Sequence, residues 1–309
     1  VGRGRCAPGL EIDQMGASTG TSGEAVGKAR ASYIVRDGMR LAQHSRGADT
    51  PEFWEGCWRA DPPRRMRGET ISHRLAWAFE RHADRSGLVV EAGCGNGNLM
   101  RTIANAGYRV EGVDFAERAV AGSRAIDPSG VYRVGDVRAM PYEDGSVGTY
   151  VSMGVIEHFS DAERGVILRE AARVLAPGGV AIVTTPFLSP LRRVRAMVGG
   201  FARASEREGA ALPFYQYYFS LVELRSFLRG AGLEPIDWGT YDSYKGIKDT
   251  IGCKRLMDRV RRIGPRAARL IEDAPSPVRV LCAHMVLVVA RKVGRGSVGA
   301  PVGGTRSAA

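Results

Sequence analysis

The sequence predicts an α/β protein built on a doubly wound sheet of seven strands. Between residues 86 and 291, short apolar segments alternate with segments whose apolar residues recur at helical spacing. This alternation is typical of a mainly parallel sheet with helices on both faces. A glycine-rich turn follows the first apolar segment, and sheets of this class bind ligands at the carboxyl ends of their strands.

The seven predicted strands are rich in β-branched or aromatic residues and end at turn residues. They span residues 88–91, 108–114, 131–136, 149–155, 180–185, 233–241 and 280–291. Helices are predicted between them, over residues 99–106, 116–126 and 160–175 and in the segment that follows Ser220. Ser160-x-x-Glu163 and Ser220-x-x-Glu223 are capping boxes, which predict where two of these helices begin.

Three segments interrupt the alternation or precede it. Residues 31–85, with Phe53, Trp54 and Trp58, are predicted to form an N-terminal helical cap. Residues 191–218 end in the aromatic run PFYQYYF and are a candidate lid over the sheet. Residues 242–279 are predicted to be an inserted helical segment, so the main domain spans residues 86–291 with two insertions.

Both ends of the chain are rich in glycine, serine and alanine and poor in large apolar residues. Residues 1–30 and 292–309 therefore bury too little surface to offset the entropy of ordering, and we expect them to be disordered.

Composition limits the class of protein. The net charge is +11, and 39 of the 44 basic residues are arginine, which attracts anions without selecting one kind. The sequence has no apolar run long enough to span a membrane and no secretory pattern, so a cytoplasmic location is expected. Five scattered cysteines without CxxC spacing predict neither a disulfide framework nor a metal site.

The loop after the first strand reads Glu-Ala-Gly-Cys-Gly-Asn-Gly from Glu91 to Gly97. A dinucleotide-binding turn needs glycine at the position that Asn98 occupies. A phosphate loop needs a Gly-Lys-Ser/Thr sequence, which does not follow here. Alternate glycines do allow the backbone to approach a bulky ligand closely, so a different nucleoside ligand is indicated.

This acid-x-Gly-x-Gly-x-Gly pattern resembles motif I of the class I S-adenosylmethionine (SAM) methyltransferases. Asp114 closes the second strand, and Asp136 closes the third in VGDVRAMPY. SMGVIEHF and RVLAPGGVAIVTTP then match the family's fourth and fifth strand segments. The resemblance is greatest to the type 11 group, which includes ubiquinone and menaquinone methyltransferases, and it implies a Rossmann-like sheet.

The resemblance also implies that SAM is the cofactor and that residues at the strand ends contact it. These residues are Glu91, Gly93, Cys94, Gly95, Gly97, Asp114, Phe115, Asp136, Val137 and Met153. Glu91 and the glycines would face the methionine part and Asp114 the ribose. Asp136 would face the adenine, although loop carboxylates also commonly cap turns.

The reaction implied is in-line displacement of the SAM methyl group onto an oxygen or nitrogen of a small-molecule or glycan acceptor. His158 is the candidate general base, because histidine exchanges a proton near neutral pH. Glu157, Tyr215 and Tyr218 are candidate acceptor contacts. A structural turn at Glu157–His158 and core packing of the tyrosines are the alternatives.

Two other functions stay open at this point. Residues 254–269 hold seven basic residues and one acid, which a nucleic-acid methyltransferase could use on phosphates, although such runs are usually solvated faces. A non-catalytic protein that binds SAM with the same fold is the second alternative. The sequence indicates neither the acceptor nor the oligomeric state.

Overall fold

The computed structural model describes residues 32–37, 40–45, 53–55, 72–198, 214–251 and 276–294. Seven strands form the main sheet in the order β5-β4-β3-β6-β7-β10-β9. Their bounds are β3 Leu88–Ala92, β4 Arg109–Asp114, β5 Val131–Val134, β6 Val147–Met153, β7 Leu175–Pro186, β9 Leu233–Tyr241 and β10 Met285–Lys292. The chain winds outward from β3 in both directions, which confirms the predicted doubly wound sheet.

The last strand differs from the prediction in direction and in length. β10 runs antiparallel to both of its neighbours, β7 and β9, whereas β3 to β7 pair in parallel. It begins at Met285 rather than at residue 280, because residues before it belong to helix α12, Ser276–Cys282. A short apolar run such as VRVLC fits a helix or a strand equally well, and here the helix packs against α6 and α9.

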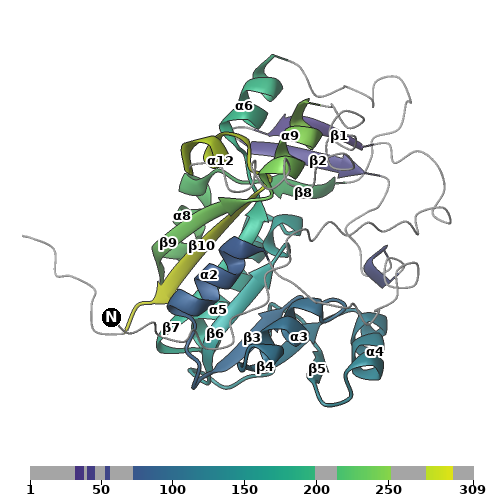
Figure 1. Ribbon diagram of the computed structural model, residues 1–309, viewed down its shortest axis with the longest axis vertical. Helices are drawn as coiled ribbons and strands as arrows, with labels where there is room; N and C mark the ends of the chain where they lie inside the picture. The colour runs from purple at the N-terminus through teal and green to yellow at the C-terminus, as the bar shows by residue number, and fades with distance from the viewer. Residues whose placement is uncertain are drawn as a thin grey trace, which may run out of the picture.

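Helices cover both faces of the sheet (Figure 1). Their bounds are α2 His73–His82, α3 Asn98–Asn105, α4 Glu117–Ile126, α5 Asp161–Val174, α6 Pro190–Met197, α8 Leu221–Gly230 and α9 Ser243–Ile251, with a 3₁₀ turn η1 at Ile156–His158. Helices α5 and α8 pack on one face and α2 and α3 on the other. Neighbouring residues of one strand point to opposite layers, as Val89 and Val90 do, so both faces are apolar.

Both predicted capping boxes mark the start of a helix. At Ser160 both reciprocal bonds form with Glu163, and α5 begins there as predicted. At Ser220 the hydroxyl accepts from the Glu223 backbone, and α8 begins there as predicted. The Glu223 carboxylate interacts with the Ser220 backbone and also forms an ion pair with Arg40.

The predicted N-terminal helical cap is wrong over its first part. Strands β1 Ser32–Asp37 and β2 Arg40–Ser45 form an antiparallel hairpin, and β8 Phe214–Tyr218 adds to its β2 edge. The aromatic run of the predicted lid is therefore a strand of a separate three-stranded sheet. Figure 1 shows this small sheet beside α6, α9 and α12 at one end of the main sheet.

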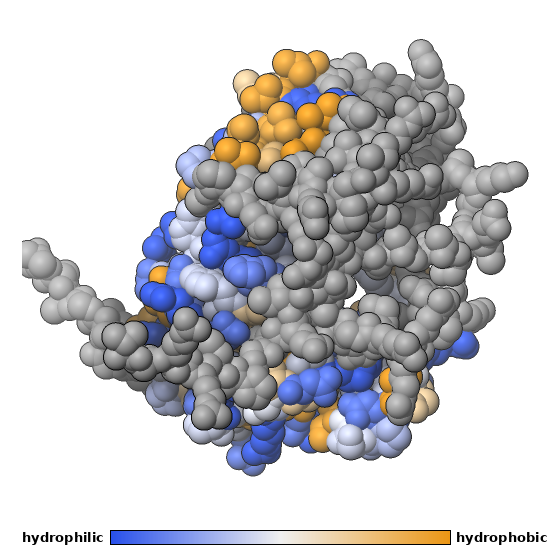
Figure 2. Space-filling view, in the orientation of Figure 1, coloured by the Kyte–Doolittle hydropathy of each residue, from blue (hydrophilic) through white to orange (hydrophobic). Residues whose placement is uncertain are grey.

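Exposed apolar side chains gather on the helices at this end. Figure 2 shows the corresponding orange surface. Its members are Val194, Met197, Val198, Ile251, Val278 and Leu281, from α6, α9, α12 and the residue after α6. Residues 199–213 and 252–275, which adjoin these helices in the sequence, lie outside the described residues, as do residues 1–31, Trp58, the basic 254–269 stretch and residues 295–309.

Close packing of α9 against the end of α12 yields a first prediction. A Cβ at Gly246 would lie 1.9 Å from the backbone oxygen of Cys282. Gly246→Ala should therefore lower the free energy of unfolding by about 2 kcal/mol or more, because backbone cannot yield as a flexible side chain does. Urea denaturation measures the change.

The matched control is Gly230→Ala in α8, where an added Cβ meets nothing within 4 Å. We expect it to leave stability unchanged or to raise it by up to about 1 kcal/mol. Equal effects of the two substitutions would contradict the packing described for α9.

Candidate active site

The glycine loop after β3 has a backbone that other residues would strain. Gly93, Gly95 and Gly97 have φ values of 77°, 50° and 71°, all in the left-handed region. A Cβ at Gly93 would lie 2.4 Å from Val155 Cγ2, and one at Gly97 would lie 2.6 Å from the ring of Tyr132. Gly97 is also the N-cap of α3, so that helix begins directly after the loop.

The carboxylate of Asp114 joins this loop to the end of β4. Its Oδ2 accepts from the Gly95 backbone at 2.8 Å, and its Oδ1 accepts from the Ala116 backbone at 2.9 Å. Burial raises the pKa of Asp114, and the two N–H donors partly oppose that shift. Each oxygen keeps a second lone pair, so the carboxylate can still accept from the hydroxyls of a bound ribose.

Glu91 lies buried at the end of β3, against the start of α3. One carboxylate oxygen accepts from the Met100 backbone, in the first turn of that helix. The other, Oε2, is buried with no hydrogen-bond partner among the described residues. Burial, with Asp114 nearby, raises the pKa of Glu91. A buried acceptor of this kind is completed by a donor of positive charge.

Asp136 is engaged by a neighbour in the same loop. Arg138 donates to both of its oxygens, with Nη2 at 2.7 Å from Oδ2, and its other branch reaches Glu163 at 3.1 Å. These bonds to Arg138 lower the pKa of Asp136. The turn-capping role that the sequence left open is thus present, and an adenine contact by this side chain stays a prediction.

The remaining predicted cofactor residues differ in exposure. Phe115, directly after Asp114, is an exposed aromatic ring at 40% accessibility, which suits contact with a flat base. Cys94 is buried against Met100 and Val120, and burial raises the pKa of its thiol, so it packs in the core. Val137 is buried in the α5-side core, and Met153 packs against the α2-side core at the end of β6.

His158 ends the 3₁₀ turn after β6 and lies within a group of aromatic rings. Its Nδ1 is 2.7 Å from the carbonyl oxygen of Tyr215 on β8. Its ring is 5.0 Å from that of Tyr215 and 5.1 Å from that of Trp54, between centroids. Phe53 adjoins both Trp54 and Tyr215. Residues 53–55 and the small sheet thus meet at the predicted catalytic histidine.

The other two predicted acceptor contacts have different places. Glu157 is buried in the same turn, beside Gly154. Tyr218 lies on the opposite face of β8 from Tyr215, since strand residues alternate. Its hydroxyl donates to Gln43, and Arg192 covers its ring at 4.5 Å. The Tyr218 side chain is buried against these partners, and an acceptor contact by it stays a prediction.

Comparisons with known proteins agree with this arrangement. A family model described as a methyltransferase domain matches residues 90–183. The ubiquinone biosynthesis O-methyltransferase of Xanthomonas euvesicatoria pv. vesicatoria is 31% identical over 186 residues, which cover 57% of this chain and 75% of that protein. The chain belongs to the class I SAM-dependent methyltransferases, in the type 11 group.

Other similar proteins include an S-adenosylmethionine-dependent methyltransferase of Mycolicibacterium smegmatis, 37% identical over 171 residues, or 55% of this chain. The match spans 59% of that relative's length. The solved structure of a SAM-dependent methyltransferase from Methanosarcina mazei is 16% identical, with a TM-score of 0.49, and covers 70% of this chain and 97% of that chain.

The residues of this methyltransferase fit its cofactor. Glu91 Oε2 offers a buried acceptor for the ammonium group of SAM, and Asp114 retains lone pairs for the ribose. When bound, SAM supplies a methyl group on a sulfonium, which is already a strong electrophile. The chain's own task is to align an acceptor with it.

Two features are absent from the described parts of the chain. No helix there is long and apolar enough to cross a membrane. No group of three or more histidine, cysteine, aspartate or glutamate side chains is placed there to ligate a metal ion.

Replacing the carboxylate at the end of β4 should weaken SAM binding. In Asp114→Asn one oxygen becomes a donor and faces a backbone N–H, so the loop is disturbed and a ribose contact is lost. We expect at least about a tenfold loss of affinity, measured by isothermal titration calorimetry. Glu117→Gln, exposed in the first turn of α4, is the control, and equal affinities for the two variants would contradict the assignment.

Burial of Glu91 should lower the stability of the protein near neutral pH, while its carboxylate strengthens SAM binding. Its pKa is raised above that of the unfolded chain, so the folded protein binds more protons, and stability falls as pH rises from the ordinary glutamate range into the raised one. Glu91→Gln should remove this slope, raise the free energy of unfolding near neutral pH by about 1 kcal/mol, and weaken SAM binding.

Urea denaturation in SAM-free buffer at several pH values tests the stability change, and calorimetry tests the affinity. Glu80→Gln, an exposed position on α2, is the control. A Glu91→Gln variant that is less stable than the wild type at neutral pH would contradict the reasoning.

Proposed function

We propose that this enzyme methylates a hydroxyl group of a small-molecule acceptor, with His158 as the general base. The observation that carries the proposal is the 2.7 Å contact between His158 Nδ1 and the Tyr215 carbonyl. A carbonyl oxygen only accepts, so Nδ1 carries the proton. In the neutral ring the basic lone pair is then on Nε2, the nitrogen that would take a proton from an acceptor.

Bound SAM would supply the methyl group to the acceptor oxygen. His158 Nε2 would take the proton that this oxygen loses, so the histidine would become an imidazolium. The Tyr215 carbonyl stabilises the imidazolium that results, because it accepts from Nδ1 in both protonation states. General base catalysis of this kind contributes about 10²–10⁴-fold.

The aromatic group around His158 supports a flat or ring-shaped acceptor. Phe53, Trp54 and Tyr215 present rings beside the base. Aromatic faces stack on other rings and on the apolar faces of sugars, so a hydroxylated ring and a glycan are both compatible. The ubiquinone biosynthesis O-methyltransferases among the relatives favour a hydroxylated aromatic ring.

Nucleic-acid methylation and a non-catalytic role are the alternatives. The basic 254–269 stretch lies outside the described residues, and the base and cofactor residues favour an enzyme over a non-catalytic protein. The cytoplasmic location expected from the sequence stays a prediction.

The acceptor class can be tested directly. The protein is incubated with methyl-labelled SAM and panels of catechols, monosaccharides, oligosaccharides and short RNAs, and products are identified by mass spectrometry. Label in a catechol oxygen supports the proposal. Label only in RNA or in an amine would overturn it.

His158→Gln should lower kcat for the acceptor found in this way by about 100-fold or more, with SAM affinity unchanged. Loss of the basic nitrogen slows proton removal but leaves the cofactor residues in place. His73→Gln, at the exposed start of α2, is the control. Full turnover of His158→Gln would remove this histidine from the mechanism.

A further inference from the structure

The turn that carries Glu157 and His158 has two backbone hydrogen bonds of its own, and the second of them is long. It is a single 3₁₀ turn between β6 and α5, in which His158 N donates to Val155 O at 3.1 Å and Phe159 N donates to Ile156 O at 3.5 Å. Such turns have poorer geometry than α-helix, so donors from elsewhere are needed to fix them.

Arg164, on the first turn of α5, supplies those donors. Its Nε donates to the Ile156 carbonyl at 3.0 Å, and its Nη2 donates to the Phe159 carbonyl at 2.6 Å. These carbonyls flank Glu157 and His158, so one guanidinium grips both ends of the turn. The Arg164 side chain is fully buried, and a cation there is stable only when its hydrogen bonds are satisfied.

The remaining donor of the Arg164 guanidinium and the flat face of the group also have partners. Nη1 pairs with Asp161 at 2.6 Å, and the group lies over the rings of Phe219 and Phe227 at 4.6 and 4.8 Å. Lysine could not reproduce this, because it has no planar fork with donors in three directions.

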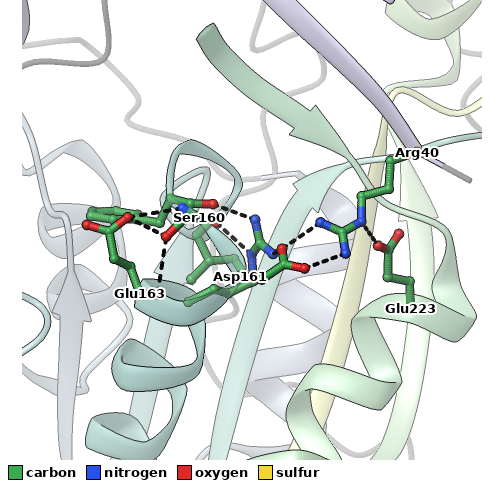
Figure 3. Close-up of polar contacts among 8 residues, drawn as sticks. Arg40, Ser160, Asp161, Glu163 and Glu223 are labelled. Carbon is green, nitrogen blue, oxygen red and sulfur yellow. Dashed lines mark hydrogen bonds and ion pairs between the residues drawn. The ribbon is translucent and has the colours of Figure 1, made fainter. Parts of the chain in front are cut away.

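A second arginine links this cluster to the small sheet (Figure 3). Arg40, on β2, donates to both oxygens of Asp161 at 2.5 and 2.7 Å and also pairs with Glu223 on α8. The Arg40 bonds lower the pKa of Asp161 to about 2, so the carboxylate stays charged throughout the physiological range. Asp161 thus bridges the arginine of the small sheet and the arginine that grips the turn.

The same small sheet contacts His158 from the other side. β2 pairs with β8, and the Tyr215 carbonyl of β8 accepts from His158 Nδ1. Arg164 therefore holds the backbone on either side of the Glu157–His158 pair, and β8 holds the His158 ring. Both supports depend on where β2 and β8 dock on the main domain.

We propose that Arg164 and Arg40 are positioning residues, which set the orientation and tautomer of His158. The tautomer of His158 then depends on docking of the β1-β2-β8 sheet. The importance of this for catalysis rests on the proposed function of His158. The positioning itself is a property of the protein without cofactor or acceptor.

The test is ¹⁵N NMR of the full-length protein labelled at histidine, recorded at about pH 8. Under these conditions the two neutral tautomers of a histidine ring give distinct ¹⁵N signals. The spectrum of His158→Gln assigns the His158 signals among the five histidines. The wild type should show His158 protonated at Nδ1 alone. Arg40→Met and Arg164→Lys should each convert this to a mixture of tautomers, while calorimetry shows SAM affinity within about twofold of wild type.

The matched control is Arg229→Met, near the end of α8, which removes an exposed ion pair with Glu234 on β9 and should leave the His158 signals unchanged. Wild-type His158 signals in both Arg40→Met and Arg164→Lys would overturn the proposal. Arg40 is partly exposed, so its variant gives a result even where the buried Arg164 substitution prevents folding. Turnover by His158→Gln, tested separately, would refute the general base without altering this result.

Discussion

The carboxylate of Asp114 is the constraint on which the cofactor end of the molecule depends. It joins the glycine loop after β3 to the start of α4 by accepting one backbone N–H from each. Because Gly93, Gly95 and Gly97 carry no side chain, the loop has few side-chain contacts of its own to hold it. A buried charged acceptor supplies that restraint and leaves room for a ligand, at the energetic cost of desolvating an acid.

Local sequence patterns predicted the main sheet because each signal is complete within a short window. Glycine spacing, capping serines and apolar periodicity located most strand ends and helix starts to within a few residues. The small sheet has no such signal. Gln43 pairs with Gln216 across 173 positions of the chain, and nothing in residues 32–45 indicates a partner so distant. Aromatic residues nearby then favoured a helical cap that is not present there.

The site shows the same division. The sequence could place Glu91 and Asp114 beside the glycine loop because their positions at strand ends fix their place in space. It could not place the Tyr218 ring, because an aromatic run does not show which face of a strand each ring occupies. Arg164 had no signal at all, since a lone arginine in a helix is usually a solvated residue. Its burial depends on carbonyls and rings contributed by three other elements.

The place of β10 has a consequence for how the chain folds during synthesis. β10 is the last described strand, yet it lies between β7 and β9, and β9 pairs with no other strand in the sheet. A nascent chain that has emerged only as far as residue 280 would thus have β7 with an open apolar edge and β9 unattached. Such edges are where chains associate wrongly. The protein's exposure to aggregation should end only when Met285–Lys292 leaves the ribosome and closes the gap.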